Sequence, residues 1–190
     1  MVKRPFSVYC DWGLHDELGD NIELDEKMTL DVLDSLKYWK EKGVTFDYYL
    51  FDAFWFEPEG DYTQFKKTHW TGGFERMRRE METLGMKPGL WFDVNGFTSP
   101  KNEKWKESLT RDGRSYCLFD GPYKEGLYNA LVHAYKEWGV RMFKLDFANQ
   151  DLIEVCNSPT PYFYRAINIP EPLSCLDLDK NNSTTTYPKD

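Results

Sequence analysis

The sequence has 190 residues, of which 41% are hydrophobic and 17% aromatic, which predicts one folded domain or part of one. A complete eightfold βα barrel takes about 250 residues, so the chain is short for that fold. The net charge of -8 and the scattered basic residues argue against nucleic acid as a partner.

The cysteines and the amino-terminal segment narrow the class of protein further. Cys10, Cys117, Cys156 and Cys175 form no Cys-x-x-Cys pair, so we expect free buried thiols rather than a zinc site or a disulfide framework. No apolar segment has the length of a signal-peptide core or a membrane span, which predicts no membrane partner. If the chain is complete, the expected location is the cytoplasm. No cofactor or metal is predicted.

The first predicted unit consists of a strand over residues 6–10, a loop over 11–16 and a helix over 25–42. In the loop, Trp12 is a candidate substrate contact and a solvated side chain is expected for His15. Asp25 is the expected N-cap of the helix. The apolar positions of its inner face are Met28, Val32, Leu33, Leu36 and Trp39.

The second and third units repeat the order of strand, loop and helix. The second strand ends at Asp52, and a loop rich in acidic and aromatic residues leads to a helix over 73–84. A long loop after a barrel strand is where an enzyme places substrate contacts, although such a loop can also simply pack on the rim. The third strand covers 90–94, where Trp91 and Asp93 share a face because they are two residues apart.

The fourth unit has a helix over 124–138, with His133 expected to be exposed, and a strand from Val140 to Phe147. Beyond residue 149 no further unit is recognisable, and five of the ten prolines lie there. We therefore expect residues 150–190 to be irregular and either disordered or truncated. Residues 1–149 predict an α/β fold, namely the first four βα units of a TIM (β/α)8 barrel.

Three of the predicted strands end in an aspartate: Asp52, Asp93 and Asp146. The carboxyl ends of neighbouring parallel strands meet at one rim, so these side chains are expected to converge there. Packing alone does not gather like charges, which indicates a functional site. Asp146 is the first catalytic candidate, and the alternative is that it caps a helix or pairs with Lys144.

At these strand ends the chain resembles the α-galactosidase (melibiase) clan of glycoside hydrolases, and glycoside hydrolase family 36 in particular. The clan has a Lys-x-Asp segment with the nucleophile in strand four, a sugar-binding Asp-Asp-Gly-Trp segment in strand two and a Gly-Leu-Trp segment in strand three. The matching segments here are Phe143 to Asp146, Leu50 to Phe56 and Gly89 to Phe92. The resemblance covers residues 9–149, and the order and spacing of the motifs make it specific.

The resemblance implies a role for each matching residue. Asp146 would be the nucleophile and Lys144 a contact to sugar hydroxyls. Asp52 and Trp55 would match the first aspartate and the tryptophan of the strand-two segment. With Trp91, Asp93 and Trp12, these residues complete the expected sugar contacts.

Two positions depart from the pattern of the clan. Ala53 stands where the clan has its second aspartate, and Phe54 stands where it has glycine. The pocket therefore lacks one carboxylate that binds the sugar, which puts galactose itself in doubt as the substrate.

The implied mechanism is retaining hydrolysis of a terminal α-linked sugar, which needs two carboxyl groups about 5 to 5.5 Å apart. Lys144 would help to keep Asp146 ionised. The clan takes its acid/base aspartate from a later strand, which no segment of this chain matches, so the isolated chain is expected to be inactive. Four strands also leave an open edge, which predicts a homo-oligomer or a missing second half-barrel as a partner.

Other functions remain open. The loss of pattern after residue 149 favours a truncated barrel that binds sugar without turnover. A metal-assisted enzyme would use Asp52, Asp93 and Asp146 as oxygen ligands. Aromatic residues beside each acid favour a sugar over a hydrated ion. A transglycosidase would use the same site as the hydrolase.

Overall fold

The computed structural model describes residues 5–19, 22–53, 55–57, 62–96, 98–110, 112–118 and 121–147. Within them, four parallel strands form one sheet in the order β1-β2-β3-β4. The strands are β1 (Val8–Cys10), β2 (Tyr48–Phe51), β3 (Lys87–Asp93) and β4 (Met142–Asp146). The predicted segment 150–190, with Cys156 and Cys175, lies outside the described residues, as does Phe54.

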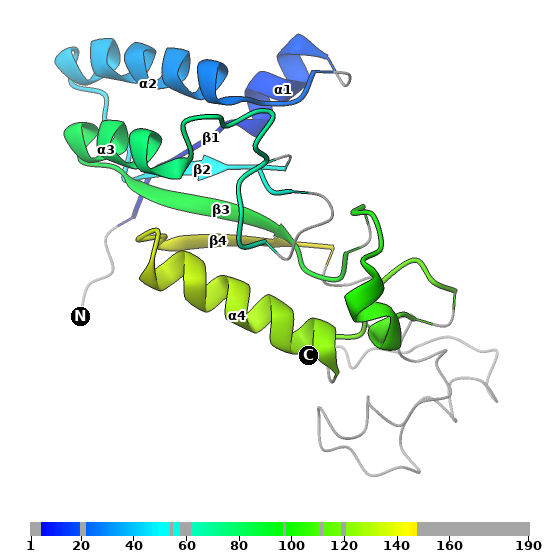
Figure 1. Cartoon of the computed structure of the whole chain (residues 1–190). Helices are drawn as coiled ribbons and strands as arrows, with labels where there is room; N and C mark the ends of the chain where they lie inside the picture. The colour runs from blue at the N-terminus through cyan, green and yellow to red at the C-terminus, as the bar shows by residue number, and fades with distance from the viewer. Residues whose placement is uncertain are drawn as a thin grey trace, which may run out of the picture.

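The helices alternate with the strands. They are α1 (Trp12–Leu18), α2 (Glu26–Glu41), α3 (Phe74–Leu84) and α4 (Pro122–Lys136), with a 3-10 helix, η1 (Glu103–Ser108), between β3 and α4. In Figure 1, α2 and α3 lie above the strands and α4 lies below them. Sequential parallel strands with helical crossovers confirm the predicted α/β partial barrel. In the described part of the chain, no helix is long and apolar enough to cross a membrane.

Local sequence signals set the helix boundaries. The carboxylate of Asp25 accepts a hydrogen bond from the amide of Met28 at 2.8 Å, which confirms it as the N-cap of α2. Helix α3 ends at Gly85, whose φ of 76° places it in the left-handed region that glycine adopts without a Cβ clash. The chain can therefore turn at once into β3.

The core lies between the sheet and these helices. Helix α3 buries the whole predicted face, which consists of Phe74, Met77, Met81 and Leu84. Helix α2 buries Leu33 and Leu36, but Trp39 is 51% exposed and so does not belong to the inner face as expected. Trp39 lies in the last turn of α2, where its ring packs against the exposed ring of Tyr38 rather than into the core.

Three expectations, one about a loop and two about histidines, are wrong. Residues 12–18 form α1 rather than a loop, although Gly13 at its start disfavours a helix. His15 is 3% exposed, and its Nδ1 lies 2.6 Å from the carbonyl oxygen of Ile22, so it ties α1 to the segment that follows. His133 is half-buried rather than exposed, because its ring packs against Trp138 at 4.8 Å.

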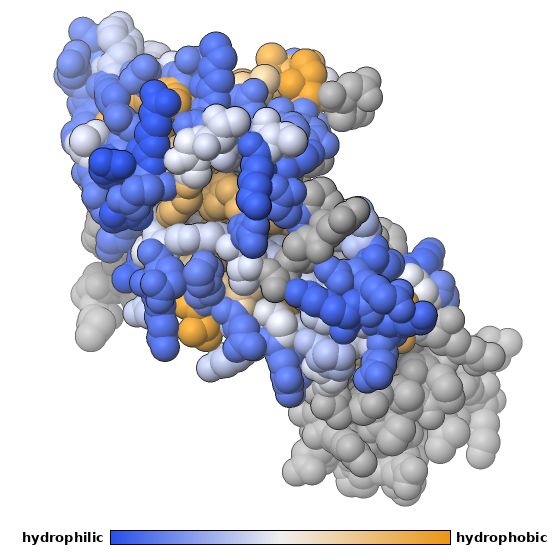
Figure 2. All heavy atoms as spheres, viewed as in Figure 1, coloured by the Kyte–Doolittle hydropathy of each residue, from blue (hydrophilic) through white to orange (hydrophobic). Residues whose placement is uncertain are grey.

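The surface over the helices is mainly polar, and the sheet has two edge strands in the described part of the chain. Figure 2 shows mainly hydrophilic atoms over α2, α3 and α4, with hydrophobic atoms visible between the helices. Within the described residues, β1 and β4 are the edge strands of the sheet. The expected partner at such an edge, a second copy or a further half-barrel, stays a prediction.

Candidate active site

A cavity of about 410 Å³ opens at the carboxyl ends of the strands. Each of the four strands, or the segment that follows it, contributes at least one side chain to the wall. The active site of a barrel enzyme lies at this end of the strands. The lining residues are Trp12, Asp52, Ala53, Trp91, Thr98, Lys144, Asp146 and Phe147. Five of the seven predicted site residues therefore meet at this cavity: Trp12, Asp52, Trp91, Lys144 and Asp146.

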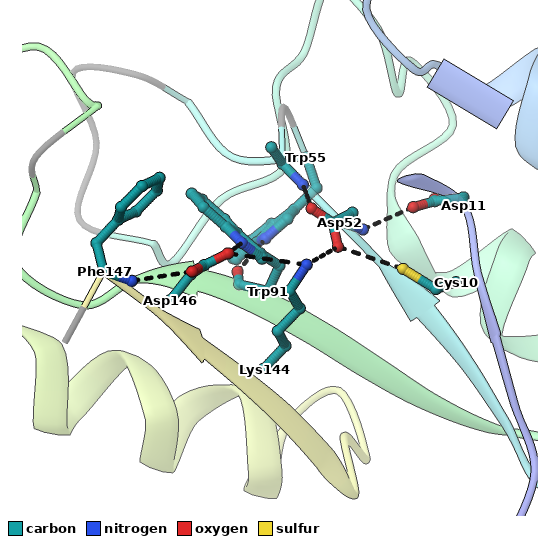
Figure 3. Close-up of polar contacts among 9 residues, drawn as sticks. Cys10, Asp11, Asp52, Trp55, Trp91, Lys144, Asp146 and Phe147 are labelled. Carbon is teal, nitrogen blue, oxygen red and sulfur yellow. Dashed lines mark hydrogen bonds and ion pairs between the residues drawn. The ribbon is translucent and has the colours of Figure 1, made fainter. Parts of the chain in front are cut away.

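Asp146 ends β4 and is held by two donors (Figure 3). Its Oδ2 accepts a hydrogen bond from Nε1 of Trp91 at 3.0 Å, and its Oδ1 accepts one from the amide of Phe147 at 3.0 Å. The Trp91 hydrogen bond, which is the largest cause, lowers the pKa of Asp146 below its ordinary value. The side chain is 41% exposed, so an ionised carboxylate faces the cavity.

Lys144 joins the two acids of the cavity. Its Nζ lies 2.8 Å from Oδ2 of Asp52 and 3.8 Å from Oδ2 of Asp146. Partial burial alone would lower the pKa of Lys144, but the hydrogen bond to Asp52 and the nearby carboxylate charges raise it. The ammonium group therefore stays charged. Lys144 and Asp146 both line the cavity, so this positive charge lies beside the Asp146 carboxylate.

Asp52 is the buried member of this group, with 2% of its side chain exposed. Besides Lys144, its carboxylate accepts hydrogen bonds from the amide of Ala53 at 2.9 Å and from Sγ of Cys10 at 3.3 Å. Burial raises the pKa of the Cys10 thiol to about 11, so the sulfur keeps its proton and acts as a donor. Each donor fixes the orientation of the Asp52 carboxylate.

Asp11 is a residue of this site that the sequence reasoning missed. Its Oδ1 accepts a hydrogen bond from the amide of Asp52 at 2.7 Å, and the residue is 2% exposed. Burial raises the pKa of Asp11 to about 8. The signal was present, because Asp11 directly follows a strand just as Asp52 does, so all four strands deliver an aspartate to the rim.

Trp55 and Asp93 do not line the cavity. Trp55 is fully buried, and its Nε1 donates to the carbonyl oxygen of Trp91 at 2.7 Å, so it supports β3 from the core. Asp93 is also fully buried, and its Oδ2 accepts from both the amide and the hydroxyl of Thr98 at 2.7 Å. Their expected roles as sugar contacts stay predictions, and their observed contacts organise the residues that do face the cavity.

Trp12 reaches the cavity from α1. It is 36% exposed, and its ring lies 4.7 Å from that of His15. The buried His15 thus braces an aromatic side chain that a ligand can reach.

The acids are not arranged as a metal site. Among the described residues, no group of three or more His, Cys, Asp or Glu side chains is placed to hold a metal ion. Asp93, one of the three ligands in the metal alternative, directs its carboxylate to Thr98 and Ser99 in the loop after β3. The described residues therefore lend no support to that alternative.

Several glycoside hydrolases of known structure share this fold. TtGalA, an α-galactosidase from Thermus thermophilus solved with p-nitrophenyl α-D-galactopyranoside, superposes with a TM-score of 0.61 and 20% identity, covering 81% of this chain and 33% of that one. α-Galactosidase I from Mortierella vinacea gives a TM-score of 0.52 and 20% identity, covering 77% of this chain and 32% of that one. A GH31 α-xylosidase from a soil metagenome gives 0.50 and 16%, covering 66% and 21%.

The chain thus has the fold of part of the α-galactosidase barrel, and it spans about a third of the length of the two α-galactosidases. This agrees with the resemblance seen in the sequence motifs at the strand ends. No family model matches the sequence, and the search of curated proteins finds no match.

Proposed function

We propose that this half-barrel is the nucleophile-bearing part of a retaining glycoside hydrolase that acts on terminal α-linked sugars, as α-galactosidases do. The observation that carries the proposal is the Asp146 carboxylate, which is favoured in its ionised form, lies beside Lys144 and faces a cavity of about 410 Å³. Proteins that share the fold were solved with stachyose and with xylose. Carbohydrate is therefore the proposed partner.

The five predicted residues that line the cavity each have a part in this mechanism. Asp146 attacks the anomeric carbon as the glycosidic oxygen leaves, and water later breaks the glycosyl ester, so the anomeric configuration is retained. Lys144 donates to a sugar hydroxyl, and Asp52 holds Lys144 in place through the 2.8 Å ion pair. Trp12 and Trp91 offer apolar ring faces to the carbon skeleton of the sugar.

The leaving oxygen needs a proton donor, and the described lining residues supply none. Their carboxylates are Asp52 and Asp146, and Asp52 is taken up by Lys144, Cys10 and the amide of Ala53. Because the sequence also has no segment that matches the acid/base aspartate of the clan, we expect no measurable hydrolysis of an ordinary aryl α-galactoside by this chain alone. The same observation favours a second candidate, a sugar-binding remnant without turnover.

An α-galactosyl fluoride separates the two candidates, because fluoride leaves without a proton. With azide added to resolve the glycosyl ester, a nucleophilic Asp146 should yield α-galactosyl azide by double inversion, which proton NMR distinguishes from the β anomer that direct displacement by azide gives. The Asp146→Asn variant should yield none, and the matched control Asp34→Asn, on the exposed face of α2, should behave as the parent chain. Running α-glucosyl fluoride in parallel tests which sugar is preferred.

The outcomes point in different directions. Equal azide product from Asp146→Asn would show that the nucleophile is misassigned. Sugar binding without any azide product would favour the remnant. Added acceptor sugars that divert the product to oligosaccharides would indicate a transglycosidase.

A further inference from the structure

A second cavity of about 290 Å³ adjoins the first. The two share three lining residues, Ala53, Trp91 and Thr98, so a ligand in one lies next to the other. The second cavity is completed by Glu23, Phe56, Lys66, Ser99 and Pro100. It contains none of the residues assigned above to the reaction except Trp91.

The polar groups of this second cavity are already paired with protein partners. Lys66 donates to the carboxylate of Glu23, which also lies 3.0 Å from Nε2 of His69. The hydroxyls of Thr98 and Ser99 point to Oδ2 of Asp93, at 2.7 and 3.4 Å. A second sugar ring would have to compete with these bonds for its hydroxyls.

The surface that remains is apolar and includes two stacked aromatic rings. The rings of Phe56 and Trp91 are nearly parallel, with an interplanar angle of 13° and centroids 6.2 Å apart. Pro100 and the methyl group of Ala53 complete this apolar wall. Contact with such a wall favours a ligand group that brings apolar area and no hydrogen-bonding demand.

The side chain at position 53 lies at the boundary between the cavities. Ala53 contributes only a methyl group to both walls. A longer side chain at this position would take up space along the wall that the two cavities share. The small residue therefore leaves room for a group that passes from the first cavity into the second.

We propose that the second cavity binds a flat apolar group of about the size of a benzene ring, attached to the sugar that occupies the first cavity. The inference rests on the proposed carbohydrate site and names the substrate class more closely. Such a group arises in two ways, as an aryl aglycone on the anomeric oxygen or as an aromatic ester on a ring hydroxyl.

Ligand-observed NMR titration of the full chain tests the proposal with three probes: methyl α-galactoside, phenyl α-galactoside and methyl 6-O-benzoyl-α-galactoside. We expect one of the two aromatic probes to bind about tenfold or more tightly than the methyl glycoside. The probe that gains identifies the source of the group.

Two variants locate the gain. Phe56→Ala removes one ring of the wall, and Pro100→Glu, at an exposed loop position, places a charge in it without touching the core. Both should abolish the gain of the aromatic probe and leave the affinity for methyl α-galactoside unchanged, with melting curves as the check on folding.

The contrary outcomes are distinct. If all three probes bind equally, the second cavity takes no apolar group, while the carbohydrate site stands. If the gain survives in both variants, it comes from another surface and the proposal is wrong. If no probe binds, the carbohydrate site and the second cavity fall together.

Discussion

The two sides of the cavity differ in how much water reaches their acids. On the side of β1 and β2, Asp52 is 2% exposed and its contacts include Lys144 and Cys10. On the side of β4, Asp146 is 41% exposed and is held by Trp91 and one backbone amide. Both acids lie within 4.0 Å of the same lysine nitrogen, so their difference comes from burial and hydrogen bonding.

This contrast assigns different work to the two carboxylates. A buried acid with several donors is rigid, because each bond it loses costs the desolvation of a group that water cannot reach. An exposed acid with a lowered pKa remains ionised and accessible, as a nucleophile must. Under the proposed function, Asp52 on the buried side positions Lys144, and Asp146 on the exposed side is the nucleophile.

The largest expected effect is on the buried side. Asp52→Ala should lower the free energy of unfolding by about 2 to 3 kcal/mol, because it leaves Lys144 and buried donors without their acceptor. Asp146→Ala, the matched change on the exposed side, should stay within about 0.5 kcal/mol. Urea denaturation measures both values, and equal losses would refute the contrast.

Asp11 gives the second effect, which depends on pH. Its folded pKa of about 8 lies above the ordinary value, so the folded state binds more protons than the unfolded state between about pH 4 and pH 8. The stabilising contribution of protonated Asp11 is complete below about pH 4 and is lost as the pH rises through about 8.

Asp11→Asn keeps the shape of the protonated acid and cannot ionise. At pH 8.5 this variant should be more stable than the parent chain by on the order of 1 kcal/mol, and near pH 4 the two should be alike. Thermal melts across this range provide the measurement. A parent chain whose stability relative to the variant does not change with pH would contradict the raised pKa.

The third effect concerns the proton affinity of Asp146. Trp91→Phe removes the 3.0 Å hydrogen bond to Oδ2 and keeps an aromatic ring in both cavity walls. The pKa of Asp146 should rise towards its ordinary value, as followed by carboxyl carbon NMR. Trp12→Phe, whose ring lines the same cavity, is the matched control and should leave that pKa in place.

The smallest effect is kinetic. With a pKa of about 11, the Cys10 thiol has little thiolate at pH 8, so iodoacetamide should alkylate it about a hundredfold more slowly than an ordinary cysteine. Peptide mapping of Cys10 against a reference peptide gives the rate. Labelling at the reference rate would mean that the thiol is not the donor to Asp52.

The arrangement of the strands and the three acidic strand ends could be predicted because each depends on local signals. Glycine stops the helices, apolar runs form the strands, and the polar residue that ends each run must lie at the rim. The placement of Asp52, Lys144 and Asp146 at one cavity follows from the parallel pairing of the strands. The register of β3 and β4, which pairs Asp93 with Asp146, agrees with the prediction that the strand ends lie at one rim.

What could not be predicted depends on where individual side chains turn. Asp93 shares the strand face of Trp91, yet hydroxyl and amide donors in the following loop draw its carboxylate away from the cavity. Trp55 is only three residues after Asp52 in the sequence, but its indole ring is buried in the core. The position of Asp11 after a strand is visible in the sequence, but the turn of its carboxylate towards the amide of Asp52 is not.

Trp91 takes part in three different interactions. Its Nε1 bonds the Asp146 carboxylate, its carbonyl oxygen receives Trp55, and its ring forms part of both cavities. A replacement of this side chain removes the Nε1 donor to Asp146 and reshapes both cavity walls at once, while the backbone carbonyl that receives Trp55 remains. During evolution, ligand preference at this wall therefore cannot drift independently of reactivity, and changes in preference are confined to the surrounding positions, such as Ala53 and Phe56.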